Sequence, residues 1–126
     1  MDKYDFLENK KINEEFAIKI ADDVNVTFKN ILKAPAEVKS DGLLLKFKDD
    51  SRLELRYPSK KKYSFNFFRN EKLFIIDTAP VHSELETYPN HIHDFEGKLM
   101  KDNITDVNND PIKNIENFLR FFKYTL

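Results

Sequence analysis

The chain has 126 residues, of which 40% are hydrophobic, 13% aromatic and 34% charged, with a formal net charge of −1. These values predict one domain, residues 1–126, around a single core, and argue against a disordered acidic tail or a uniformly basic coat for nucleic acid. The absence of cysteine excludes disulfides, thiolate catalysis and zinc sites built from cysteine. No apolar run resembles a signal peptide or approaches the ~18 residues of a membrane span, so we expect a cytoplasmic protein without membrane contact.

The first third of the chain predicts helix followed by strand. Apolar residues between positions 5 and 21 recur with a patchy helical period, which indicates one broken helix or two short ones. In "VNVTFKN", Val24, Val26 and Phe28 then alternate with polar residues. A period of two is typical of a half-buried strand. Pro35 marks the break that follows.

Two hairpins are predicted in the middle of the chain. "LLLKFK" and "RLELRY" flank a turn at residues 49–51, and "YSFNFFR" and "LFIID" flank a turn at residues 70–72. Alternation in the first hairpin turns its charged side chains to the face opposite Leu45 and Leu53. The second hairpin is apolar on both faces, which favours central strands.

A long irregular connection and a helix complete the expected fold. Residues 78–110 are rich in Asn and Asp and contain Pro80, Pro89 and Gly97, which is typical of a loop. Asp110 is a candidate N-cap before Pro111, and an apolar stripe of helical period follows. We therefore predict an α+β fold: an antiparallel sheet of about five strands with an N-terminal helix and an amphipathic C-terminal helix packed on one face. A half-open barrel plugged by the C-terminal helix is the alternative.

Charge is distributed unevenly between the sheet and the connection. Residues 43–69 hold eight Lys or Arg against three acidic residues, whereas residues 77–110 hold eight acidic residues against two Lys. The basic segment could bind RNA phosphates, or its lysines could only keep an exposed edge soluble. The candidate RNA-binding residues are Lys46, Arg52, Arg56, Tyr63 and Arg69.

All histidines of the chain, His82, His91 and His93, fall within the predicted connection. In an extended segment, "HIH" places both of its imidazoles on one face and turns Ile92 toward the core. Two bases on one face can address the same atom or the same phosphate group.

The segment between Pro80 and Pro89 is expected to leave the sheet and return to it. Each proline restricts its own backbone and biases the preceding residue toward extended geometry. We therefore predict that His82 and Asp77 form one site with the two later histidines. A distance above about 10 Å from His82 to both of them would contradict a single site, because it exceeds hydrogen-bond reach even through one water.

Three roles are open for the histidines. With Asp94 as a carboxylate ligand, they could bind a divalent transition metal such as zinc, iron, manganese or nickel, with nitrogen-to-metal distances near about 2.1 Å. Without a metal, they could be the general acid and base of phosphodiester cleavage, with Asp77 orienting a ring and Arg56 or Arg69 stabilising the phosphorane charge. They could also only fasten the loop by bonding to backbone carbonyls.

The stretch "YSFNFFRNEKLFIIDTAPVHSELETYPNHIHD", followed by an acidic linker and a terminal helix, resembles the TumE family, small prokaryotic proteins that form the toxin component of a toxin–antitoxin pair. The family is expected to show a "YSYHW"-like strand, then "FRWDNAPHH", then "TFPHHKH". The resemblance covers residues from about 40 to 126. The sequence departs from these motifs at Ile76, Thr78, Val81 and Asn90, where the motifs have Arg, Asn, His and His.

The resemblance implies a toxin that is neutralised by a cognate antitoxin and acts on RNA. Together with the clustered histidines, it leads us to expect a ribonuclease-like toxin. The alternatives are a non-catalytic protein that binds a cellular target or its antitoxin through the loop and the sheet, and a metal-binding protein. The sequence is also compatible with a homodimer.

Overall fold

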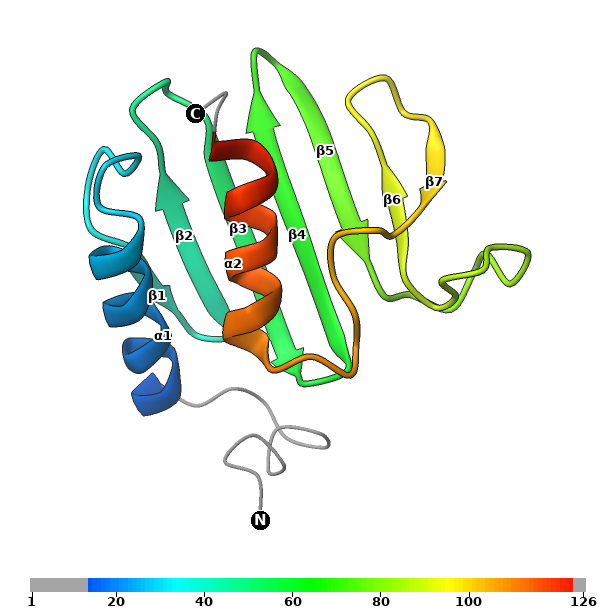
Figure 1. Ribbon diagram of the computed structural model, residues 1–126, viewed down its shortest axis with the longest axis horizontal. Helices are drawn as coiled ribbons and strands as arrows, with labels where there is room; N and C mark the ends of the chain where they lie inside the picture. The colour runs from blue at the N-terminus through cyan, green and yellow to red at the C-terminus, as the bar shows by residue number, and fades with distance from the viewer. Residues whose placement is uncertain (1–13, 124–126) are drawn as a thin grey trace.

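The computed structural model describes residues 14–123 (Figure 1). In chain order the elements are α1 (Glu14–Thr27), β1 (Glu37–Lys39), β2 (Gly42–Lys46), β3 (Arg52–Ser59), β4 (Lys62–Arg69), β5 (Lys72–Asp77), β6 (His91–His93), β7 (Leu99–Lys101) and α2 (Pro111–Phe122). The part of the predicted N-terminal helix before position 14 lies outside the described residues. So does Leu126, the last apolar residue of the predicted C-terminal stripe. None of the helices in the described range is long and apolar enough to cross a membrane.

The seven strands form one open antiparallel sheet in the order β1 to β7, with both helices on one face (Figure 1). The predicted α+β fold is therefore confirmed, and the structure is a sheet with β1 and β7 as its edges rather than the alternative, a half-open barrel plugged by the C-terminal helix. The predicted number of about five strands is too low. The strands β1, β6 and β7 have three residues each, which is too short for a recognisable period of two.

The expected strand at Val24–Phe28 is wrong, because α1 continues to Thr27. Val24 is fully buried while Val26 is 80% exposed, although a strand would place both on the same face. The buried residues of this segment instead recur at helical spacing: Ala17, Ile20, Ala21, Val24 and Phe28. Of the three alternating residues, Val24 and Phe28 therefore belong to this helical stripe, and Val26 faces solvent.

Both predicted hairpins are present. In β2 and β3, Leu45 pairs with Leu53, and the two side chains face the helices. In β4 and β5, Arg69 pairs with Lys72, so the turn consists only of Asn70 and Glu71, with φ of 51° and 65°. Two successive residues with positive φ match the twist of the flanking strands.

The core lies between the sheet and the helices and is rich in aromatic rings. The α2 ring of Phe118 lies 5.3 Å from that of Phe65, and the ring of Phe122 lies 4.8 Å from that of Phe67. The predicted helix start is confirmed, since Asp110 is the extended residue before Pro111, although its side chain makes no capping hydrogen bond. Burial of these large rings is the main term that holds α2 against the sheet.

The face of the sheet opposite the helices, called the open face below, carries three rows of side chains, because directly paired residues point the same way. The first row is Gly42, Arg56, Ser64, Asp77, His91 and Lys101. The second row is Leu44, Glu54, Asn66, Ile75, His93 and Leu99. The third row is Lys46, Arg52, Phe68 and Leu73.

Candidate functional site

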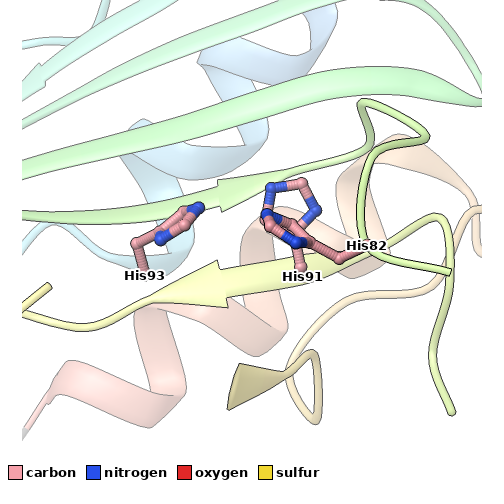
Figure 2. Close-up of side chains that lie close together, drawn as sticks. All are labelled: His82, His91 and His93. Carbon is pink, nitrogen blue, oxygen red and sulfur yellow. The ribbon is translucent and has the colours of Figure 1, made fainter. Parts of the chain in front are cut away.

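The three histidines lie together on the open face (Figure 2). The ring centroid of His82 lies 4.8 Å from that of His91 and 5.8 Å from that of His93, and the centroids of His91 and His93 are 5.1 Å apart. All three rings meet edge to face. This separation is well inside the limit set for a single site, so the imidazoles form one cluster, called the histidine cluster below.

Strand pairing explains why residues distant in sequence meet here. Asp77 at the end of β5 pairs with His91 at the start of β6, so the segment 78–90 leaves and re-enters the sheet at neighbouring positions. Within it, backbone hydrogen bonds Leu85 N–H to His82 O and Tyr88 N–H to Leu85 O form successive tight turns. The predicted irregular connection is therefore interrupted by β6 and β7, and the expected extended "HIH" is confirmed as a strand, with Ile92 buried on the helix side.

Two of the rings are oriented by contacts through Nδ1. In His91, which is buried, Nδ1 lies 3.2 Å from the carbonyl oxygen of Pro89, and a carbonyl only accepts, so Nδ1 carries the hydrogen of that bond. In His82, Nδ1 lies 3.5 Å from Oε1 of Glu84. Contacts at Nδ1 leave Nε2 available for chemistry, which is how catalytic and ligating imidazoles are commonly oriented.

The cluster changes the protonation of His93. Its pKa is lowered from the ordinary value by partial burial, and then by the neighbouring His91 and His82, while Asp77 acts in the opposite direction. A ring in this environment is neutral near pH 7 and can accept a proton. Asp77 itself is held in place, because its Oδ1 accepts the N–H of Ala79 at 3.0 Å.

The histidine cluster is the one group within residues 14–123 whose His, Asp and Glu side chains lie close enough to hold a metal ion. Its candidate ligand nitrogens lie within 4.8 Å of one another. Three nitrogens at about 2.1 Å from one ion can be no more than about 4.2 Å apart, so a metal would require the rings to close further. Asp94 is not a member of the group, and its Oδ1 accepts the N–H groups of Glu96 and Lys98 at 2.9 Å each, in the turn after β6.

A buried polar network fixes the start of β6 from the helix side. The amide nitrogen of Asn90 donates to the Tyr63 hydroxyl at 2.8 Å and to Oδ2 of Asp102 at 2.9 Å. The same hydroxyl lies 2.8 Å from Oγ1 of Thr105. Since Asn90 directly precedes His91, these bonds position the backbone from which the most enclosed imidazole projects.

Tyr63 is not on the surface that the sequence suggested for RNA binding. It is only 3% exposed, it stacks on Tyr57 at 4.8 Å, and burial raises the pKa of its phenol above the ordinary value. Its ring is enclosed on the helix side, so it is unavailable for stacking on a base.

The candidate arginines divide between the two faces. Arg56 lies on the open face, where its Nη2 is 2.9 Å from Oδ2 of Asp41. Three strand spacings separate the backbone of Arg56 from that of His91, which is about 14 Å, so Arg56 lies outside the histidine cluster. With Ser64 and Asp77 it lines a pocket of about 420 Å³. Arg69 lies on the helix side, with Nε 3.3 Å from Oδ2 of Asp49 and its guanidinium over Phe67, away from the cluster.

Lys101 is a basic residue close to the cluster that sequence reasoning missed. It pairs with His91 across β6 and β7, at a spacing of about 5 Å between strands. Its exposed ammonium group lies 3.8 Å from the carboxylate of Glu86. The three residues of β7 give no strand signal in the sequence, so only the observed pairing places this lysine beside the histidines.

Laid residue by residue on "FIIDTAPVH", the motif "FRWDNAPHH" has its Arg at Ile75 and not, as expected, at Ile76. Ile75 pairs with His93 on the open face, so the Arg that this chain lacks would lie beside the histidine cluster. The other departures remove no group from the cluster. Ile76, Thr78 and Asn90 are buried outside it, Ile76 in the core and Asn90 in the polar network. Val81 is 66% exposed next to His82, so an imidazole there would lie at the rim.

Comparison with curated proteins and with solved structures found no match. A family model described as "Toxin TumE" matches residues 11–125, which is nearly the whole chain. The resemblance seen in the motifs therefore extends into α1, and the chain belongs to the TumE toxin family.

Proposed function

We propose that this toxin is one half of a toxin–antitoxin pair and that it cleaves RNA by acid–base chemistry of the histidine cluster, without a metal. The observation that carries the proposal is the meeting of His82, His91 and His93 on the open face, with ring centroids 4.8 to 5.8 Å apart. Imidazoles at this spacing can serve opposite sides of one phosphate group. Membership of the TumE family supports the assignment as a toxin, and a protein antitoxin is the expected partner of such a toxin.

The proposed reaction uses the 2′-hydroxyl of RNA as the nucleophile. One neutral ring removes the hydroxyl proton while O2′ bonds to phosphorus, and a second, protonated ring donates its proton to O5′ as the P–O5′ bond breaks. The products are a 2′,3′-cyclic phosphate and a free 5′-hydroxyl. His93 is our candidate for the base, because its pKa is lowered.

Charged groups beside the histidine cluster orient its rings and neutralise the charge that develops on the phosphate. Asp77, anchored through the N–H of Ala79, faces the rings and favours the imidazolium that forms during the reaction. Lys101, the cross-strand partner of His91, is the cation best placed to stabilise the negative charge that develops on the phosphorane. Arg56 and Arg52 lie farther along the sheet, where they can hold neighbouring phosphates.

The test is RNA cleavage by the purified protein in excess EDTA, comparing wild type with His82→Asn and His93→Asn. These two rings are half-buried, so Asn is tolerated more readily there than at the buried His91. We expect cleavage in EDTA with cyclic phosphate ends, and a loss of about 10²- to 10⁴-fold in rate for each variant. Lys98→Ala, an exposed change in the turn after β6, is the control and keeps full activity.

Two other results would each contradict the proposal. Activity that is absent in EDTA and returns with Zn²⁺ or Mn²⁺ would assign the cluster to metal binding. Intact RNA under all conditions, with growth arrest unchanged in a variant lacking all three histidines but abolished by Arg52→Glu with Arg56→Glu, would identify a non-catalytic binding protein.

A further inference from the structure

We infer that the substrate is single-stranded RNA laid across the open face, and that the Arg52–Phe68 pair is the platform on which one of its bases stacks. This inference rests on the proposed function and adds the class of RNA and a binding residue, Phe68, that the sequence analysis did not single out.

Arg52 and Phe68 together form a flat surface, with the guanidinium lying over the ring. Cζ of Arg52 lies 4.0 Å from the centroid of the Phe68 ring, so the guanidinium packs over the ring. Nε of Arg52 also lies 3.4 Å from Oε1 of Glu54, which fixes the group from one edge. The Arg52 side chain nevertheless remains 47% exposed, and Phe68 is only half-buried. A guanidinium held in this way offers a planar surface for a nucleobase.

The platform lies on the same face as the histidine cluster and within one short stretch of RNA. Phe68 is in the third row, on β4, and His93 is in the second row, on β6. Two strand spacings and two residues along the strand separate them, which is about 12 Å. Between them lie half-buried Asn66 and Ile75, a polar and an apolar contact for the intervening nucleotides.

This arrangement fits unpaired RNA better than duplex RNA. In a duplex, the bases are stacked on one another and a flat protein surface reaches mainly phosphates and 2′-hydroxyls, whereas unpaired bases can turn toward aromatic rings and guanidinium planes. Moreover, the two arginines of the open face are partly neutralised, Arg52 by Glu54 and Arg56 by Asp41. Attraction of phosphates to these arginines is therefore modest, and stacking on the Arg52–Phe68 pair adds to the affinity.

The experiment measures binding separately from cleavage, in a His82→Asn background whose expected cleavage rate is at least about 10²-fold below that of wild type. Fluorescence anisotropy gives Kd for a short unpaired oligoribonucleotide and for the same sequence annealed into a duplex. We compare Phe68→Leu, which keeps apolar volume but loses the planar ring, and Phe68→Tyr, which keeps the ring. The matched control is Phe121→Leu, because Phe121 is 56% exposed on α2, away from the open face.

We expect the unpaired strand to bind more tightly than the duplex, and Phe68→Leu to weaken its binding by about fivefold or more, the effect of losing one stacked base. Phe68→Tyr, which keeps the ring, should restore most of the affinity that Phe68→Leu loses, and Phe121→Leu should bind like the parent. Arg52→Gln should weaken binding by a similar factor, whereas Arg120→Gln, on α2, should not.

Equal affinity for unpaired and duplex RNA, or unchanged binding in both Phe68→Leu and Arg52→Gln, would overturn the inference. Its failure is distinguishable from failure of the proposed function. Cleavage that requires the histidines but does not depend on Phe68 and Arg52 would support the proposed function and contradict this inference. Conversely, Phe68-dependent binding of unpaired RNA without any cleavage would support the inference and refute the chemistry.

Discussion

His91 shows, at the scale of single residues, why a purely structural role explains the cluster poorly. Its Nδ1 bond to the Pro89 carbonyl is what a loop-fastening histidine would make. However, one such bond does not require His82 and His93 to pack their rings within 6 Å of it and of each other. Close imidazoles repel when more than one is protonated, so the arrangement costs stability at low pH. A site that retains this cost is more readily explained by function than by folding.

The lowered pKa of His93 predicts how stability depends on pH. The folded protein takes up this proton less readily than the unfolded chain, whose histidine titrates near 6.5. The unfolded state therefore binds more protons between the two pKa values, and the free energy of unfolding falls as the pH drops below about 6.5 through the folded pKa. We expect His93→Asn to remove part of this fall. Urea unfolding at about pH 7.5 and about pH 5 measures it.

The control for this prediction is Asn66→Ala, a change in the same row of the open face that removes no titrating group. It should keep the full pH dependence of the parent protein. If His93→Asn and the parent lose the same free energy of unfolding between the two pH values, His93 is not the group responsible.

At the scale of elements, the hairpins could be predicted because each carries its own signal: alternating side chains and a turn of a few residues. The start of α2 was predictable for the same reason, from Asp110 and Pro111. By contrast, β6 and β7 exist only because β5 provides an edge for β6 to pair with, and a three-residue strand leaves no period to detect. The histidine cluster could be proposed from composition, whereas Lys101 beside it could not.

The incorrect strand at residues 24–28 has the same kind of explanation. Three alternating apolar residues fit a strand, but they also fit a helix if the middle one faces solvent, and only packing against the sheet decides between the two. Tyr63 shows that the sequence also leaves open on which face of the sheet a side chain lies. It was a candidate RNA-binding residue of the basic segment, but the register of β4 turns its side chain into the core.

The helical assignment of this segment predicts unequal effects for two equivalent substitutions. Val24→Ala removes two buried carbons from a fully enclosed site and should lower the free energy of unfolding by about 2 kcal/mol. Val26→Ala should change it by less than about 0.5 kcal/mol, because Val26 is 80% exposed. Urea unfolding of both variants gives the comparison. Equal losses would mean that the two valines share a buried face, as a strand requires.

At the scale of the whole molecule, one face of the sheet stabilises the fold and the other carries the residues of the proposed chemistry. The helix side holds the aromatic core and the buried polar network, and the open face holds the histidine cluster at one end and the Arg52–Phe68 platform at the other. We therefore expect substitutions on the open face to change the proposed RNA binding with little effect on folding. Both arginines of this face, Arg52 and Arg56, have a carboxylate partner.

This pairing leads to a prediction in which a substitution improves binding. Glu54 neutralises Arg52 at 3.4 Å, and both side chains are about half exposed. Glu54→Gln removes the negative charge while retaining a polar side chain of the same shape, so Arg52 becomes a stronger phosphate ligand. Unpaired RNA should bind more tightly to this variant. The logarithm of the affinity should also fall more steeply with the logarithm of the salt concentration, by up to about 0.7 for one additional phosphate contact on a single strand.

The matched control is Glu116→Gln, which releases Arg120 from an equivalent surface ion pair of 3.4 Å on α2. Both substitutions raise the net charge by one, so a nonspecific effect of charge would strengthen RNA binding equally in the two variants. A gain confined to Glu54→Gln would place the RNA on the open face, because only that substitution changes the charge beside the platform. Equal gains, or a gain confined to Glu116→Gln, would mean that the RNA does not bind at the Arg52–Phe68 pair. The RNA would then have to approach the histidine cluster from another side of the molecule.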